Sequence, residues 1–395
     1  MRYASVTERL SGLGGEKWAL HARARAMKAG GEPIIEMTIG EPDIPTPTAF
    51  IDAAYRAMQS GRTGYSNGRG EPALVKALAA RYSQRRGRLI TPDQVICLPG
   101  TQTTLYTILR TIAEAGDEVL VGDPMYATYE GIIAQSGARM VPVPLRPEFG
   151  FRMQVADVAA RITPASRVLF LNTPHNPTGA LLRPEDLAAL GALAKANDLW
   201  IVSDEVYEEM VFPGVTFASP LDLPDLADRV ISACSISKSH AAPGFRSGWC
   251  IGPVEFCRRL LPLSETMLFG SQPFIADMTA LAISEPSPVS DGMVARFSRR
   301  AGLIADTLDG VAGLRAHRPE AGMFTLIDVR ATGLSGTGFA EGLLAAQKVA
   351  VMPGESFGQG LNGWIRLSLT QPDDLTVEAA KRIAAHAAKL LEQAA

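Results

Sequence analysis

Five short apolar segments, separated by helix-type stretches, constrain the fold of this chain more than any other feature of its sequence. They end near Leu98, Val121, Leu171, Ser203 and Cys234. Strand-type and helix-type segments that alternate at this spacing predict a mainly parallel sheet with helices on both of its faces. The carboxyl ends of parallel strands meet at one edge, where α/β proteins place their ligands. We therefore expect the polar residues that follow these segments to lie together.

The C-terminal part of the chain has a different pattern. A long helical stretch is expected from residue 256 to 285, and Pro286-Ser287-Pro288 then favours a domain boundary. The helix-type and strand-type stretches beyond it predict a smaller α+β unit, onto which the first residues fold back. We expect an α/β large domain over residues 46–285 and a small domain made of residues 1–45 and 286–395.

The composition argues against several classes of function. The 38 Lys and Arg residues against 41 Asp and Glu leave a net charge of -3, whereas nucleic acids and membranes normally attract a basic surface. We expect neither partner, and the first twenty residues predict neither a signal peptide nor a membrane span. The cysteines show no metal-type spacing, so we expect no metal site and buried reduced thiols in a cytoplasmic protein. They are Cys97, Cys234, Cys250 and Cys257.

The fifth strand runs into the segment Ser235-Ile236-Ser237-Lys238, and Arg246 follows in the same loop. If the two serine hydroxyls and the guanidinium converge, they form an anion site with the lysine amine inside it. An amine held beside a bound phosphate can bond covalently to a phosphorylated aldehyde, which is the chemistry of pyridoxal phosphate (PLP). Taken alone, Lys238 could equally be a surface lysine.

A second anion-binding pattern follows the first of the five strands. Pro99-Gly100 makes a turn, and Thr101 and Gln102 open a helix. The first N–H groups of a helix have no partner within it, and the helix dipole favours an anion, so this turn could hold a phosphate. Threonine also caps helices for structural reasons alone, and these residues by themselves leave both alternatives open.

The middle strands deliver residues that suit a planar cofactor. Tyr126 follows the second strand, where it could stack on a ring or only cover the end of the sheet. Asn176 lies in a rigid loop after the third strand, Asp204 ends the fourth, and Tyr207 comes just behind it. A carboxylate at the end of a buried strand needs a cationic partner or a helix to cap.

Together these residues supply each contact that PLP needs. Lys238 provides the amine for the aldehyde, Asp204 a counter-ion for the ring nitrogen, and Tyr126 a cover for the ring face. Asn176 and Tyr207 can donate hydrogen bonds to the ring hydroxyl. The phosphate would be surrounded by Thr101, Gln102, Ser235, Ser237 and Arg246.

Arg366 interrupts the otherwise apolar strand from Trp364 to Leu369. An arginine in such a place is usually on an edge strand or extends its head group into solvent. It could instead be a buried guanidinium that binds a carboxylate through two hydrogen bonds. The strand alone does not decide between these interpretations.

Four motifs, given below in their order along the chain, resemble those of the class I/II, fold-type I aminotransferases. The resemblance extends from Gly40 to Arg366 and implies a large domain with a mainly parallel sheet between helices, plus a smaller α+β domain. It also implies the PLP contacts given above, and a substrate α-carboxylate held by Arg366, Asn176 and the backbone of Gly40. The motifs are Gly40-Glu41-Pro42-Asp43, Asn176-Pro177-Thr178-Gly179, Asp204-Glu205-Val206-Tyr207 and the segment from Ser235 to Arg246.

The same resemblance implies a homodimer with shared active sites. Tyr65 lies in a glycine-rich loop from Gly61 to Gly70, and in this family the tyrosine of that loop reaches the phosphate in the neighbouring subunit's site. The implied reaction moves an amino group from an L-amino acid to a 2-oxo acid by a ping-pong mechanism. Lys238 then acts as base and acid on the proton of the substrate Cα.

Resemblance to particular subgroups of the family indicates which substrate to expect. The general similarity is to aspartate aminotransferases, some of which use a lysine where this chain has Gln102. Three stretches more closely resemble arginine–pyruvate transaminases, which implies a basic or neutral amino donor and pyruvate as acceptor. Glu16 and Glu41 are the candidate partners for a guanidinium, and two alternatives stay open: an aspartate/2-oxoglutarate-type aminotransferase and a PLP-dependent C–S β-lyase. The three stretches that resemble arginine–pyruvate transaminases are Ser237-Lys238-Ser239-His240, Met267-Leu268-Phe269-Gly270-Ser271 and Gly322-Met323-Phe324.

Overall fold

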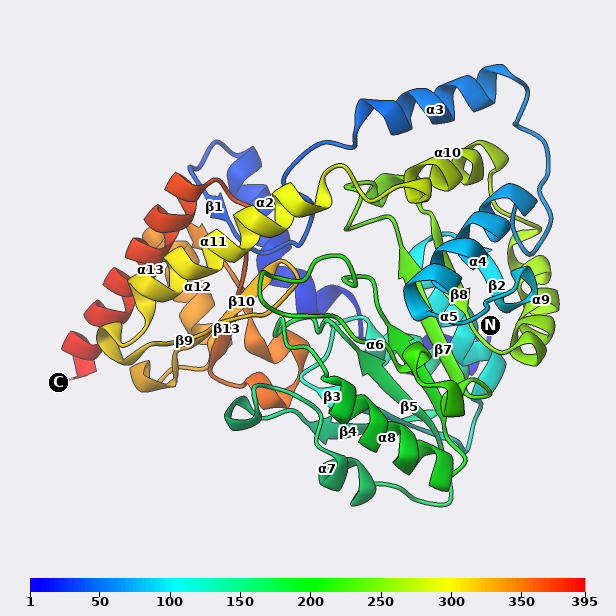
Figure 1. The fold of residues 1–395 in the computed structure, drawn as a ribbon. Helices are drawn as coiled ribbons and strands as arrows, with labels where there is room; N and C mark the ends of the chain where they lie inside the picture. The colour runs from blue at the N-terminus through cyan, green and yellow to red at the C-terminus, as the bar shows by residue number, and fades with distance from the viewer. Residues whose placement is uncertain (395) are drawn as a thin grey trace.

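A seven-stranded sheet forms the centre of the larger part of the molecule (Figure 1), which a computed structural model describes over residues 1–394. The strand order is β2-β8-β7-β6-β5-β3-β4. Strands β7, β6, β5, β3 and β4 run parallel, whereas β8 is antiparallel to both of its neighbours and places Gly248 opposite Ser235 of β7. The strands are β2 (Val95–Leu98), β3 (Glu118–Asp123), β4 (Arg139–Pro144), β5 (Ser166–Asn172), β6 (Trp200–Asp204), β7 (Val230–Ser235) and β8 (Gly248–Ile251).

Both faces of this sheet are apolar, because successive side chains of a strand point to opposite faces. In β5, Val168 and Phe170 belong to one buried cluster, and Leu169 and Leu171 belong to another. Residues of α5, α6 and α9 complete the first cluster, and residues of α4, α8 and α10 the second. The helices of this part are α3 (Thr48–Gln59), α4 (Pro72–Arg86), α5 (Gly100–Ile112), α6 (Tyr129–Ser136), α7 (Val155–Ala159), α8 (Pro184–Ala196), α9 (Val254–Leu268) and α10 (Pro273–Ser284).

The five predicted strands and the mainly parallel sheet are confirmed. Each strand ends at the expected residue or no more than two residues beyond it. Two further strands were not predicted. The edge strand β4 contains Pro142 and Pro144. Prolines in a sequence usually indicate a loop, but they are tolerated in a strand that has one unpaired side. The other, β8, has only four residues and comes directly after the Arg246 segment.

The single helical stretch expected from residue 256 to 285 is wrong, because α9 and α10 are separate helices. Between them Phe269 and Gly270 have φ values of 60° and 144°, which a right-handed helix does not allow. A Cβ atom on Gly270 would lie 2.7 Å from the backbone oxygen of Ser66. The chain therefore breaks where it packs closely against the glycine-rich loop.

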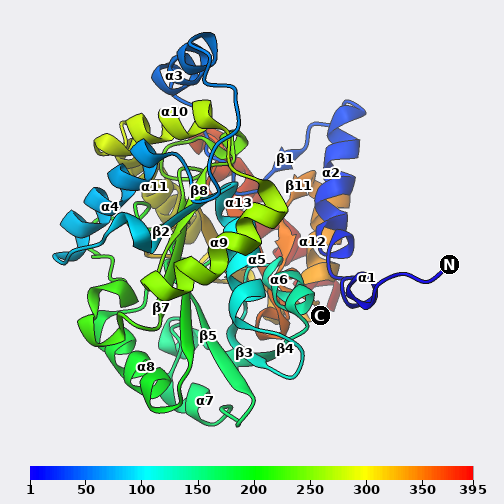
Figure 2. The same ribbon diagram turned by 90° about the vertical axis from the view of Figure 1, so that its right-hand side faces the viewer.

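An antiparallel sheet of order β12-β13-β10-β9 forms the centre of the second part of the molecule. Helix α2 lies beside β11 (Figure 2), and β1 pairs with β11 in parallel, which attaches the N-terminal segment to the C-terminal elements. The division into residues 46–285 and residues 1–45 with 286–395 stays a prediction. The elements are α1 (Ser5–Arg9), α2 (Ala19–Ala29), β1 (Ile35–Glu36), α11 (Ser290–Leu308), β9 (Arg315–His317), β10 (Phe324–Asp328), α12 (Gly336–Gln347), β11 (Val349–Ala350), β12 (Met352–Pro353), β13 (Trp364–Ser368) and α13 (Asp373–Ala394).

The structure also bears on the expectations drawn from composition. All four cysteines are buried and unpaired, as predicted. Burial raises the pKa of the Cys97 thiol to about 12, so this group stays protonated near neutral pH. Within residues 1–394, no helix has both the length and the apolar character needed to cross a membrane.

Candidate active site

A cavity of about 260 Å³ lies at the carboxyl ends of β5, β6 and β7 and extends to β13. It is bordered by residues from both parts of the molecule. All of the predicted site residues except Tyr65 line it, although their roles stay predictions. They are Gly40, Thr101, Gln102, Tyr126, Asn176, Asp204, Tyr207, Ser235, Ser237, Lys238, Arg246 and Arg366.

Lys238 extends its amine into this cavity from the loop after β7. Its Nζ donates a hydrogen bond of 2.6 Å to the backbone oxygen of Gly40. Burial lowers the pKa of Lys238 to about 8, while the carboxylate of Glu41 acts in the opposite direction. Most of the amine is still protonated near physiological pH, but the neutral fraction, which a nucleophile or general base requires, is far larger than for an ordinary lysine.

Asp204 ends β6 with a buried carboxylate that has neutral hydrogen-bond donors. The hydroxyl of Tyr129 donates to Oδ2 at 2.7 Å, and the backbone N–H of Val206 donates to Oδ1 at 3.1 Å. Burial raises the pKa of Asp204 to about 6, although both hydrogen bonds oppose the shift. A protonated ring nitrogen placed beside this carboxylate would stabilise its charge, so the site fits the nitrogen of PLP.

Hydroxyl groups, a helix N-terminus and a guanidinium meet at another end of the cavity. Thr101 lies in the first turn of α5, and its buried Oγ1 has no hydrogen-bond partner within residues 1–394. A Cβ atom on Gly100, whose φ is +80°, would collide with the guanidinium of Arg246. Ser235 and Ser237 face the same space. An anion here would satisfy the orphan hydroxyl and the free N–H groups of α5, so these residues fit the phosphate of PLP.

Tyr126, Tyr207 and Asn176 also line the cavity. Tyr126 packs edge-on against Tyr129, with 5.6 Å between ring centroids. Tyr207 is buried, and burial together with the nearby Tyr126 raises the pKa of its hydroxyl. Tyr207 therefore stays a neutral donor, which suits the predicted hydrogen bond to the ring hydroxyl.

Arg366 is a buried guanidinium, so the edge-strand interpretation is wrong. Its strand, β13, lies between β12 and β10, and the residue is 1% exposed. The guanidinium lies between the rings of Phe324 and Phe357, 3.9 and 4.2 Å from their centroids. It donates to Asn176 Oδ1 at 3.1 Å and to the backbone oxygen of Thr38 at 2.6 Å.

This guanidinium has no carboxylate partner within residues 1–394, and its buried Nε has no hydrogen-bond partner there. Burial lowers the pKa of Arg366 to about 9, since no anion compensates for the loss of water. An isolated buried cation is unfavourable unless an anion binds to it. Arg366 is therefore suited to a ligand carboxylate.

Other predicted residues lie apart or have different partners. Tyr65 is 90% exposed and packs edge-on against Phe269, with 4.9 Å between ring centroids. Gln102 borders the cavity, but its Oε1 accepts a hydrogen bond from Thr128 at 3.0 Å. Over the described residues, the cavity lining includes neither Glu16 nor Glu41, although the carboxylate of Glu41 is close enough to act on the pKa of Lys238.

Eight lining residues were not predicted as parts of the site, and three of them have side chains that can form hydrogen bonds. Tyr129 is the first residue of α6 and bonds to Asp204, and its spacing of three from Tyr126 was the signal that could have found it. Asn172, the last residue of β5, belongs to the same strand-end pattern as Asp204. Trp18 comes from a short turn before α2, and no local pattern indicates that it reaches the cavity.

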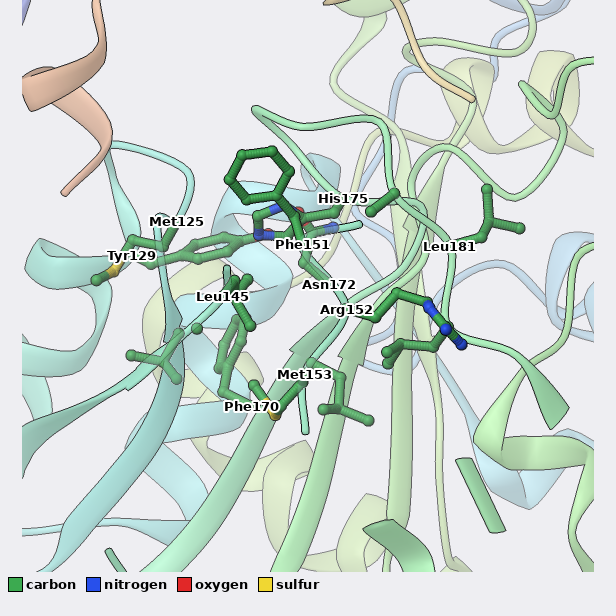
Figure 3. Close-up of a pocket in the computed structure, with 15 residues that line it drawn as sticks. Met125, Tyr129, Leu145, Phe151, Arg152, Met153, Phe170, Asn172, His175 and Leu181 are labelled. Carbon is green, nitrogen blue, oxygen red and sulfur yellow. The ribbon is translucent and has the colours of Figure 1, made fainter. Parts of the chain in front are cut away.

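A second, smaller cavity has a volume of about 20 Å³ (Figure 3). Tyr129 and Asn172 line both cavities. The walls of the smaller cavity are mainly apolar, with Leu145, Phe151 and Phe170 around it. This volume suffices for about one water molecule. The second cavity therefore offers no space for a cofactor or an amino acid.

Comparisons with known proteins agree with this geometry. The family model described as aminotransferase class I and II matches residues 32–383. The chain is 44% identical to an arginine–pyruvate transaminase of Pseudomonas aeruginosa over 394 residues, which cover 100% of both chains. It is 31% identical to an aspartate aminotransferase of Musicola paradisiaca over 96% of each chain. The aspartate aminotransferase of Thermus thermophilus with maleate superposes with a TM-score of 0.90 at 30% identity, covering 98% of this chain and 100% of that one.

Proposed function

Because the chain belongs to the class I and II aminotransferases, whose members depend on PLP, we propose that it transfers the amino group of a basic or neutral L-amino acid to pyruvate. One observation carries the proposal. The amine of Lys238, the carboxylate of Asp204 and the unpaired guanidinium of Arg366 border the same cavity. These groups suit, respectively, the aldehyde of PLP, its ring nitrogen and the α-carboxylate of an amino acid.

In the proposed site, the residues of this chain would hold the cofactor at its phosphate, ring nitrogen, ring hydroxyl and ring face. Thr101, Gln102, Ser235, Ser237 and Arg246 surround the phosphate. Asp204 keeps the ring nitrogen protonated, Asn176 and Tyr207 donate to the ring hydroxyl, and Tyr126 covers the ring face. When bound, PLP supplies the aldehyde that accepts the amino group and a ring that takes up electrons from the substrate Cα.

The substrate is held by a second set of lining residues, which includes Asn176 again. Arg366 and Asn176, with the backbone of Gly40, bind the α-carboxylate and so fix the position of the Cα proton. Lys238 Nζ takes this proton and later returns a proton, acting first as base and then as acid. The oxo-acid product leaves before the second substrate binds, so the kinetics are ping-pong.

The charges around the cavity argue against an acidic amino donor. Over the described part of the chain, the charged residues that line it are Asp204, Lys238, Arg246 and Arg366. Each of the three cations has a role with the phosphate, the amine or the α-carboxylate, so this chain contributes none for a second carboxylate. The 44% identity to an arginine–pyruvate transaminase supports a basic or neutral donor, with pyruvate as acceptor.

We further propose a homodimer in which Tyr65 reaches the phosphate site of the partner subunit. Tyr65 and Phe269 form an exposed aromatic pair, and Ile51, Tyr55 and Met58 are exposed on α3. This helix lies at the periphery of the molecule in both views (Figures 1 and 2). Contiguous exposed apolar side chains of this kind mark interaction surfaces. The buried, unpaired cysteines support a reducing compartment, and we propose the cytoplasm.

A half-reaction screen of the PLP-loaded enzyme tests the proposed function. Each amino acid is added without an oxo acid, and the absorption band of the lysine-bound cofactor is recorded. Arginine or a neutral amino acid should bleach the band, and pyruvate should restore it, whereas Lys238→Ala should show neither change. Bleaching by aspartate with recovery by 2-oxoglutarate would favour the aspartate-type alternative. Release of pyruvate and ammonia from a cysteine conjugate without any oxo acid would instead indicate a β-lyase.

A further inference from the structure

The loop of residues 38–43, which carries Gly40, is attached to its surroundings at both ends. At one end, the backbone oxygen of Thr38 accepts a hydrogen bond from Arg366 at 2.6 Å. At the other end, the carboxylate of Asp43 accepts two hydrogen bonds from Arg296 and one from Arg300, each of 2.8 Å. The proposed aminotransferase reaction uses Gly40 but assigns no role to Asp43.

The contact of Asp43 with α11 is buried and charged. The side chains of Asp43 and Arg300 are each 6% exposed, and that of Arg296 is 28% exposed. Burial alone would raise the pKa of Asp43, but the hydrogen bonds from Arg296 and Arg300 hold this pKa below its ordinary value. Paired hydrogen bonds between arginine and a carboxylate are strong and directional. The position of Asp43 is therefore tightly defined.

Arg300 connects this contact to the strand that carries Arg366. Its Nη1 also donates to the backbone oxygen of Leu369 at 2.9 Å, just beyond the end of β13, and its Nε donates to Asp373 at 2.9 Å. The Asp43 end of the loop and the guanidinium proposed to bind the substrate thus share one support.

The chain between Asp43 and Gly40 is short and stiff. Pro42 fixes its own φ and restricts the conformation of Glu41. Gly40 is also packed closely against the ring of Phe324, because a Cβ atom at this position would collide with that ring. A shift of Asp43 is therefore transmitted to the carbonyl of Gly40 and is not absorbed in between.

The carbonyl of Gly40 is the acceptor for Lys238 Nζ, at 2.6 Å. A neutral amine has two N–H bonds and one lone pair, so donation of one N–H to a fixed carbonyl limits the directions in which the lone pair can point. The lone pair must face the Cα proton of the substrate for transfer to occur. A misplacement of about 1 Å in such an arrangement can lower a rate about 100-fold.

We propose that Asp43 is a positioning residue for proton transfer. Through Arg296 and Arg300 it holds the Gly40 carbonyl where that carbonyl orients the amine of Lys238. This inference rests on the proposed function, because it takes Lys238 as the group that moves the proton.

The test compares Asp43→Asn with the wild type, both as full-length PLP-loaded enzyme. Steady-state kinetics are measured with an accepted amino donor and with the same donor deuterated at Cα. We expect kcat to fall on the order of tenfold and the deuterium isotope effect on kcat to rise, because proton transfer becomes slower relative to other steps. The KM of the donor should change less, since Arg366 and Asn176 remain.

A matched control and a milder variant keep the test decisive. Asp306 lies on α11, the helix that carries Arg296 and Arg300. Asp306→Asn removes the exposed ion pair of Asp306 with Arg318, and it should leave kcat and the isotope effect unchanged. Arg296→Gln removes two of the three hydrogen bonds to Asp43 at a less buried residue, and it should shift both quantities in the direction of Asp43→Asn. If Asp43→Asn does not fold, the kinetics of Arg296→Gln decide whether the inference holds.

Two results have different meanings. If the variants lower only the melting temperature, with kcat and the isotope effect as in the wild type, Asp43 has a purely structural role and the inference is overturned. If the wild type and Asp306→Asn themselves transfer no amino group, it is the proposed function that fails.

Discussion

Two arginines border the same cavity in opposite environments. Arg246 is exposed, and its guanidinium donates to the backbone oxygen of Pro243 at 2.8 Å. Arg366 is buried between two aromatic rings, and it forms no ion pair with a carboxylate within residues 1–394. We propose that the first binds the phosphate of a cofactor that stays in place, and that the second binds a carboxylate that enters and leaves in every cycle.

The difference in burial matches this difference in ligands. An exposed guanidinium shares the phosphate with hydroxyls and helix N–H groups, so no single contact dominates. A buried guanidinium depends on its ligand much more strongly, because an unpaired charge in a water-free site is unfavourable. The buried site should therefore discriminate more sharply between ligands with and without a carboxylate.

Replacement of Arg366 should have the largest effect. In Arg366→Ala the KM should rise about 10²- to 10³-fold for every amino donor and for the oxo acid, as expected when one partner of a buried charge pair is removed. The affinity for PLP should stay close to that of the wild type. Steady-state kinetics with several donors, together with a PLP titration, measure both quantities. An effect on one donor alone would move Arg366 from the α-carboxylate to the side-chain pocket.

Replacement of Arg246 should have a smaller effect on a different quantity. In Arg246→Ala the dissociation constant for PLP should rise roughly tenfold, because one charge-assisted contact among several is lost. With saturating PLP, the KM of the amino donor should return to nearly the wild-type value. A raised KM that persists at saturating PLP would show that both arginines act on the substrate, and the proposed division of roles would be wrong.

The smallest effect should be on pH dependence. The pKa of Lys238 is lowered to about 8, mainly by burial and also by the charges of Arg366 and Arg246, of which Arg366 is the stronger. Because the neutral amine is the base, the rate of the half-reaction should rise with pH through about 8 and then level off. Loss of a nearby positive charge should raise this pKa, so the profile should move to higher pH in Arg366→Gln and by less in Arg246→Gln. Rapid-mixing absorbance measurements over a pH series give both profiles, and a larger shift in Arg246→Gln would reverse the order.

The sequence was most informative where a residue follows a buried parallel strand. Asp204, Asn176 and Lys238 come after three different strands, yet the parallel arrangement brings them to one cavity, as predicted. Apolar runs mark such strands clearly, and the edge at which they end then follows from the arrangement itself. The convergence of the cofactor residues was therefore predictable without the coordinates.

Residues whose position depends on pairing over long sequence distances were less predictable. Arg366 is central because β10 and β12 flank its strand, and nothing within Trp364 to Leu369 indicates that order. Trp18 reaches the cavity from the N-terminal segment, which is attached to the C-terminal elements through β1 and β11. The break between α9 and α10 likewise depends on a contact of Gly270 with Ser66.

The antiparallel direction of β8 has a consequence for the engineering of this enzyme. Because Ser235 of β7 faces Gly248 of β8, residues 236–247 form a loop that leaves the sheet and returns to it at neighbouring positions. A Cβ atom on Gly248 would lie 2.7 Å from the backbone of Gly100, so the return point cannot shift sideways. An inserted or deleted residue would change the separation between Lys238 and Arg246, whereas substitutions would preserve it. Residues 236–247 therefore form a cassette of fixed length, to be exchanged between related enzymes as a whole.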